Sequence, residues 1–173
     1  MTSTTPDLAD QLQEFRDHRE MTDRLATWCR CVDTRDMGPM TDVFDEDVVW
    51  DFGGGTVDRG LAAVVERITA HVVVATYCGN RQIHLANVRI DIDGDTARSS
   101  AYFFSTSAGI REYEGQALLE WGTYDDTWRR GSAGWRIAHR NYEMRIQSGP
   151  LEIVYGSAPA EMWQEGDHRR LDH

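Results

Sequence analysis

The sequence predicts an α+β fold in which helices come first and close off a curved antiparallel sheet. Apolar residues recur with the helical period over residues 7–33, and again from residue 60 to about residue 74. Beyond residue 80 they alternate as in strands, and turn signals such as Asp93-Gly94 separate the runs. Helices followed by a series of hairpin-connected strands are typical of the α+β class.

Size and charge limit the class of protein. A chain of 173 residues fits a single domain, and we expect a core over about residues 7–147 with a C-terminal tail over 148–173. The net charge of −11 argues against nucleic acid or an anionic membrane surface as a partner. The aromatic content instead favours a hydrophobic small molecule or another protein. No apolar run is long enough to span a bilayer, and the N-terminus lacks a signal-peptide core, so we expect a cytoplasmic protein.

The first helical region ends in an acidic residue. We expect a short helix that runs into a longer one, with an apolar stripe made of Met21, Leu25, Trp28, Cys29 and Val32. Asp33 follows Cys29 by four residues, which places its carboxylate at the edge of that stripe. The alternative is a helix-end residue that hydrogen-bonds to nearby backbone.

The remaining elements follow from the same patterns. We expect a helical turn over 40–44, a strand over 47–52, a helix over 60–74, a strand around His84, further strands over 97–107, 113–130 and 135–146, and a short helix around 160–164. Gly53-Gly54-Gly55 lacks the spacing and the lysine of a phosphate-binding loop, so it is predicted to be a flexible connection.

One titratable residue falls on the apolar face of a predicted strand. Counting back by twos from Ile92 gives Ile90, Val88, Ala86 and then His84, so the imidazole is expected on the buried face. Such a histidine is either a satisfied core residue or a functional base, and the sequence pattern alone leaves both readings open.

Metal and cofactor sites are not predicted. Cys29 and Cys31 are two positions apart on a predicted helix, so their thiols point to nearly opposite faces. The histidines other than His84 show no metal-ligand spacing. We therefore expect no metal ion and no organic cofactor.

The order of elements and four motifs resemble a known family. The motifs span residues 28–36, 45–50, 82–84 and 122–128, and the similarity extends over about residues 19–146. The chain resembles the SnoaL-like family of the nuclear transport factor 2-like superfamily, in its scytalone dehydratase, bile-acid dehydratase and hexachlorocyclohexane dehydrochlorinase branch. The resemblance implies a cone-shaped barrel, made of a curved antiparallel sheet with N-terminal helices closing the pocket, whose open end holds a hydrophobic substrate.

The resemblance also implies a set of site residues. Its enzymes pair an aspartate at the end of the long helix with a histidine on the sheet, and Asp33 and His84 match those positions. The positions that would contact substrate are Trp28, Trp50, Phe52, Phe103, Ser105 and Tyr124. The chain departs from the dehydratases at several of them: one dehydratase has tyrosine at Trp28 and an acid near Ser105, and another has tyrosine near Phe52 and a second histidine on the strand of Phe103.

Two classes of function follow. The first is a cofactor-free lyase or dehydratase, or an isomerase or cyclase, on a hydrophobic oxygenated molecule such as a polyketide, terpenoid or steroid. In it His84 is the base, and Asp33 orients the ring and stabilises the imidazolium. The second is a non-catalytic binding or assembly subunit of the kind found as the small subunit of ring-hydroxylating dioxygenases. A long, half-open sheet with apolar side chains on both faces also predicts a homo-oligomer, a dimer or trimer.

Overall fold

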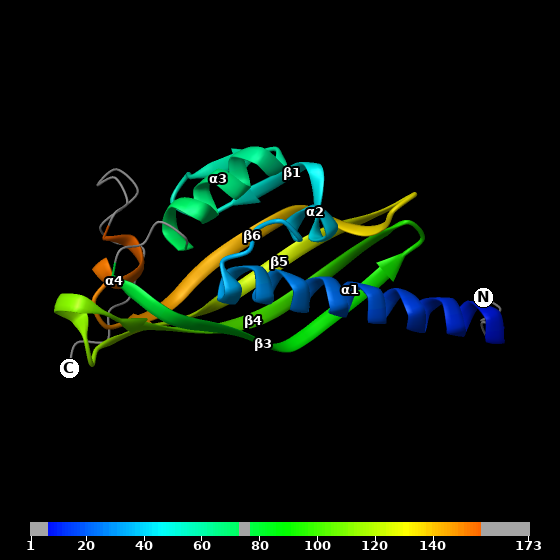
Figure 1. Ribbon diagram of the computed structural model, residues 1–173. Helices are drawn as coiled ribbons and strands as arrows, with labels where there is room; N and C mark the ends of the chain where they lie inside the picture. Colours follow the sequence, from blue (N-terminus) through cyan, green and yellow to red (C-terminus); the bar gives the residue numbers. More distant parts are fainter. Residues whose placement is uncertain (1–6, 73–76, 157–173) are drawn as a thin grey trace.

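The protein folds as a curved six-stranded sheet with helices on its concave side (Figure 1). The fold is given by a computed structural model, which describes residues 7–72 and 77–156. Its elements in order are α1 (Leu8–Thr34), α2 (Met40–Val43), β1 (Phe44–Asp51), β2 (Val57–Arg59), α3 (Leu61–Val72), β3 (Cys78–Asp93), β4 (Thr96–Gly109), the 3-10 turn η1 (Arg111–Tyr113), β5 (Ala117–Gly131), β6 (Gly134–Ser148) and α4 (Glu152–Tyr155). The predicted α+β class is confirmed.

The sheet is open, because its two edge strands do not pair with each other. The strand order is β2-β1-β6-β5-β4-β3, with β1 and β6 parallel and every other pair antiparallel. The described helices α1 and α3 pack their apolar faces into one core with the inner face of the sheet. Among the described residues, no helix is both long and apolar enough to cross a membrane.

The long helix is continuous, where two helices were expected. Asp7 caps its start by accepting a hydrogen bond of 2.8 Å from the Asp10 N–H. Its end is fixed by Arg35, whose guanidinium donates to the carbonyl oxygens of Val72 and Cys78. These bonds tie the end of α1 to the end of α3 and the start of β3, so the three elements meet at one end of the sheet.

Other boundaries differ from the sequence prediction. The predicted strand over 113–130 begins at Ala117, because the preceding residues form the turn of η1. The short elements β2 and α4 carry too few residues for a periodic signal and were not predicted. The helix predicted around 160–164 lies outside the described residues.

A β-bulge in β3 reverses the faces of its side chains. The pairing with β4 shifts between Ala86 and Arg89, and Asn87 takes a left-handed backbone conformation with φ 53°. One extra residue moves every later side chain to the opposite face. Ile90 and Ile92 therefore share the inner face with Ile83, and His84 is exposed. The prediction that His84 stands on the buried face is wrong, because counting by twos assumes an unbroken strand.

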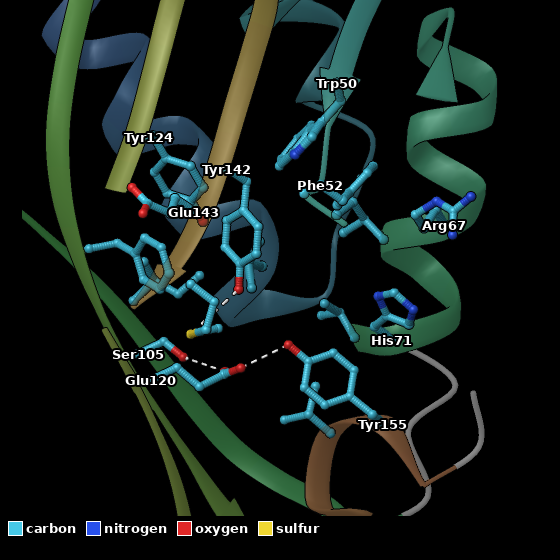
Figure 2. A pocket seen from close by; sticks show the side chains of 18 of the residues that line it. Trp50, Phe52, Arg67, His71, Ser105, Glu120, Tyr124, Tyr142, Glu143 and Tyr155 are labelled. Carbon is cyan, nitrogen blue, oxygen red and sulfur yellow. Dashed lines mark hydrogen bonds between the residues drawn. The ribbon is translucent and has the colours of Figure 1, made fainter. Parts of the chain in front are cut away.

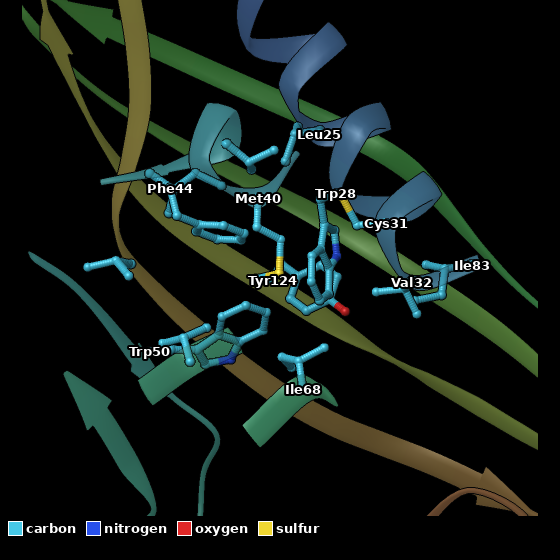
Figure 3. Close-up of a cluster of buried hydrophobic side chains, with 14 of the residues drawn as sticks. Leu25, Trp28, Cys31, Val32, Met40, Phe44, Trp50, Ile68, Ile83 and Tyr124 are labelled. Atoms are coloured by element: carbon cyan, nitrogen blue, oxygen red, sulfur yellow. The ribbon is translucent and has the colours of Figure 1, made fainter. Parts of the chain in front are cut away.

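The core contains a buried ion pair that packs against a cluster of aromatic rings. Arg140 donates two hydrogen bonds to the Asp126 carboxylate, at 2.7 and 2.8 Å, and both side chains are buried. The guanidinium also lies 4.3 Å from the ring centre of Tyr124 and 5.1 Å from that of Trp50. Figure 3 shows Trp28 together with these two rings in the buried cluster. The ion pair therefore packs against the aromatic side chains and helps to fix their positions.

Candidate active site

A cavity of about 410 Å³ opens between the inner face of the sheet, the C-terminal end of α1, and helices α3 and α4 (Figure 2). Its lining includes all six positions predicted to contact substrate, namely Trp28, Trp50, Phe52, Phe103, Ser105 and Tyr124. Their common location agrees with a ligand site, and their role in binding stays a prediction.

Aromatic rings form one wall of the cavity. Trp50 stacks on Phe52 with ring centres 4.9 Å apart and planes inclined by 6°, and it meets Trp28 edge-on. Phe103 stacks against Tyr124 at 4.9 Å. Gly122 makes this packing possible, because a Cβ atom there would lie 2.5 Å from the Phe103 ring. The wall therefore offers flat apolar surfaces suited to a hydrophobic ring system.

A buried carboxylate lies on the sheet side of the cavity. Glu120 is 2% exposed and lies directly between Ser105 on β4 and Gln147 on β6 in the strand register. Ser105 donates to Oε2 at 3.0 Å, and Gln147 donates to Oε1 at 3.4 Å. From the other side of the cavity, the Tyr155 hydroxyl donates to Oε1 at 2.8 Å, as Figure 2 shows. Three neutral donors thus fix the orientation of one carboxylate on the cavity wall.

The hydroxyl groups beside this carboxylate are held in their protonated form. Burial, followed by the nearby Glu120 charge, raises the pKa of Tyr155 well above its usual value. Burial likewise raises the pKa of Tyr142 well above its usual value. Both phenols line the cavity. Because their raised pKa values keep them protonated, both can donate hydrogen bonds at neutral pH.

Two basic groups on α3 also face the cavity. Burial, helped by the charges of Arg67 and Arg81, lowers the pKa of His71 to about 4, so the ring is neutral at pH 7. Arg67 donates two hydrogen bonds to the Asp58 carboxylate, which neutralises its charge. Arg81 lines the cavity from β3, and no such ion pair is made to it by any described residue.

The predicted pair of Asp33 and His84 is not assembled in the cavity. Asp33 accepts a hydrogen bond of 2.9 Å from the Ile83 N–H, a backbone donor on β3 and not one at the end of its own helix. Burial raises the pKa of Asp33, and the bond from Ile83 opposes that shift. His84 stands on the outer face of the sheet, where its ring stacks on Phe104 at 6.5 Å. Neither side chain lines the cavity.

The sequence patterns were not used to predict Glu120, the acid that the structure places in the cavity wall. Glu120 shares its inner face with Leu118, and with Tyr124 further along β5. Alternation along that strand carries a signal for an inward-facing acid comparable to the one used for His84. Tyr155 carried no signal, because it reaches the cavity from a four-residue helix in the predicted tail. Among the described residues, no group of three or more histidine, cysteine or acidic side chains is placed to hold a metal ion.

Solved structures share this fold. A protein provisionally assigned as an aromatic ring hydroxylase from Novosphingobium aromaticivorans is 27% identical, with a TM-score of 0.69 over 81% of this chain and 97% of that chain. A hexachlorocyclohexane dehydrochlorinase, LinA type 2, is 15% identical, with a TM-score of 0.68 over 89% and 99%. A protein provisionally assigned as a scytalone dehydratase, also from Novosphingobium aromaticivorans, is 18% identical, with a TM-score of 0.65 over 79% and 87%.

The sequence itself identifies the family. No curated protein matches the chain. The SnoaL-like domain family, however, matches it over residues 13–141, which include most of α1, the sheet as far as the first half of β6, and most of the cavity lining. A member of the nuclear transport factor 2-like superfamily from Salmonella enterica has the same fold, with a TM-score of 0.63 at 21% identity over 73% of this chain and 89% of that chain. The chain therefore belongs to the SnoaL-like family and has the nuclear transport factor 2-like fold.

Proposed function

We propose that this protein is a cofactor-free acid–base enzyme of the lyase or isomerase type, in which Glu120 moves a proton on a hydrophobic oxygenated molecule bound in the cavity. The observation that carries the proposal is the Glu120 carboxylate itself, which is buried on the wall of an apolar cavity and oriented by Ser105, Gln147 and Tyr155. A carboxylate accepts about four hydrogen bonds, so three donors leave room for a substrate proton.

The chemistry that suits this arrangement is proton abstraction next to a carbonyl group. Glu120 takes the proton, and the electron pair of the C–H bond moves into an enolate. The protonated phenol of Tyr142 lines the same cavity, and it can exchange its weak 3.8 Å hydrogen bond to Met144 Sδ for one to an enolate oxygen. Return of the proton to a different carbon completes an isomerisation, whereas departure of a neighbouring leaving group with its bonding electrons completes an elimination.

A proton-exchange experiment tests the proposal without knowledge of the natural substrate. 2-Tetralone is a bicyclic ketone with acidic C–H groups beside its carbonyl, and its exchange with D2O is followed by proton NMR. We expect the protein to accelerate exchange over the protein-free rate, and we expect Glu120→Gln to lose about 10²–10⁴-fold of that acceleration, the usual contribution of a general base. An equal rate with and without protein contradicts the proposal.

One observation favours a second candidate, a non-catalytic binding subunit. The histidine that the family resemblance assigns as the base is on the outer face of the sheet. If no other group replaces that histidine as the base, the cavity serves to bind a ligand and not to transform it. The same experiment separates the candidates, because a binding subunit would quench its cavity tryptophans on adding 2-tetralone and would not accelerate exchange.

A further inference from the structure

Two N–H groups of a cation on the cavity wall have no hydrogen-bond acceptor among the described residues. Arg81 lies on the inner face of β3, two residues before Ile83, and lines the cavity. Its Nε and Nη1 atoms are buried, and no described residue accepts a hydrogen bond from them. Withdrawal of a guanidinium from water is costly unless acceptors replace the water. Arg81 is therefore a candidate binding group for an acceptor-bearing ligand.

The other charged groups of the cavity are already engaged. Arg67 is bound by Asp58, and Glu143 by Arg145. Glu120 is held by three neutral donors and keeps room for the substrate proton. The indole N–H of Trp50, which can only donate, is also buried without a partner among the described residues. His71 is neutral at pH 7, so it adds no second positive charge beside Arg81. The buried N–H groups of Arg81 and Trp50 therefore need hydrogen-bond acceptors, which a bound ligand can supply.

We propose that the ligand of this cavity carries a carboxylate, which binds to Arg81 while its apolar body lies against the aromatic wall. This inference rests on the proposed function, because it names the chemical class of the substrate for the same site. Carboxylate is the group that matches the planar fork of a guanidinium, with two parallel hydrogen bonds.

The strand register places this anchor away from the proton-transfer group. Arg81 is opposite Ser107 on β4, whereas Glu120 is opposite Ser105 on the same strand. Arg81 and Glu120 are therefore two strands apart, or about 10 Å across the sheet between their backbones. A substrate held at Arg81 by its carboxylate can present a C–H group of its ring system to Glu120.

A pair of isosteric probes tests the anion site directly. 2-Naphthoate and its neutral amide, 2-naphthamide, have the same ring system, and Trp28 and Trp50 in the lining report binding by fluorescence quenching. We expect the protein to bind 2-naphthoate at least about tenfold more tightly than 2-naphthamide, as for a charge-assisted pair out of water. Arg81→Met should remove this preference while leaving the affinity for 2-naphthamide within about twofold, because packing surface is retained.

Controls make the result specific to this side chain. Arg89→Met removes a cation from the same strand at an exposed position and should keep the full preference. If Arg81→Met does not fold, as judged by circular dichroism, Arg81→Gln decides the question by the same criterion. Equal affinity for the two probes, binding of neither, or a preference that survives the loss of Arg81 overturns the proposal.

Probe binding and proton exchange test the anion site and the proposed function separately. Glu120→Gln should keep or strengthen the preference for 2-naphthoate, since it removes a negative charge from the cavity, although it abolishes exchange on 2-tetralone. Exchange without a carboxylate preference would overturn the anion site alone. A carboxylate preference without exchange would overturn the proposed function alone.

Discussion

The Ile83 N–H donates a hydrogen bond of 2.9 Å to the Asp33 carboxylate, which joins the end of α1 to the edge strand β3. This bond indicates a structural role for Asp33 beside Ile83, which lines the cavity. We expect Asp33→Ala to lower the free energy of unfolding by about 1–3 kcal/mol, because it leaves a partly buried N–H without its acceptor. Urea denaturation measures that loss. The exchange rate of 2-tetralone, measured on the folded variant, should stay within about twofold of the wild-type rate, whereas a general base would contribute far more.

The bulge at Asn87 determines which face of β3 each side chain occupies. Asn87 has φ 53°, a conformation that glycine adopts readily and β-branched residues avoid. We expect Asn87→Gly to leave the melting temperature nearly unchanged. Asn87→Val should lower the free energy of unfolding by about 1–2 kcal/mol, the cost of a left-handed residue. Similar melting temperatures for the two variants would show that the bulge does not exist in solution.

The ion pair of Arg140 and Asp126 supports the aromatic wall. We expect Arg140→Met to destabilise the fold by about 3–5 kcal/mol, because it leaves the Asp126 carboxylate buried without its partner. The double variant Arg140→Met, Asp126→Leu should recover most of the loss, since replacing both charges removes the unpaired one. Chemical denaturation of the three proteins gives the comparison, and a double variant as unstable as the single one would mean that packing, not charge, accounts for the cost.

The buried His71 predicts a pH dependence of stability. Its pKa in the folded protein is about 4, against an ordinary value of 6.5, because burial disfavours the charged ring. Between these values the unfolded chain binds a proton that the folded protein does not. The contribution of His71 to stability is therefore full above pH 6.5 and is lost as the pH falls to about 4.

The substitution His71→Gln isolates this contribution from the carboxylates that titrate nearby. Urea denaturation at a series of pH values should show a flatter decline for the variant than for the wild type between pH 6.5 and 4. Parallel curves for the two proteins would contradict a depressed pKa at this position.

Much of the fold follows from local patterns, whereas the aromatic lining was predicted from the family resemblance. Periodicity predicted the long helix and the hairpin strands, and the matched positions Trp28, Trp50 and Tyr124 do line one cavity. The face of His84 was predicted wrongly because a bulge leaves the composition of a strand unchanged and shifts its register through one backbone conformation. The homo-oligomer stays a prediction.

Alternation along β5 marks Glu120 as an inward-facing acid, but it does not distinguish the proposed proton-transfer group from a structural acid. That distinction depends on long-range pairing, in which Ser105, Gln147 and Tyr155 converge on Glu120 from two other strands and a short helix. Arg81 stands out only because the described residues around it supply no acceptor to its Nε and Nη1 atoms. Both observations concern contacts between residues far apart in the chain.

The central claim is that Glu120, and not His84, is the acid–base group, and one pair of rates tests it most directly. Deuterium exchange of 2-tetralone is measured for Glu120→Gln and His84→Ala side by side, with circular dichroism to confirm that both are folded. The structure predicts that Glu120→Gln loses about 10²–10⁴-fold of the acceleration and that His84→Ala keeps the wild-type rate. A folded His84→Ala protein without activity, beside an active Glu120→Gln protein, would contradict the account.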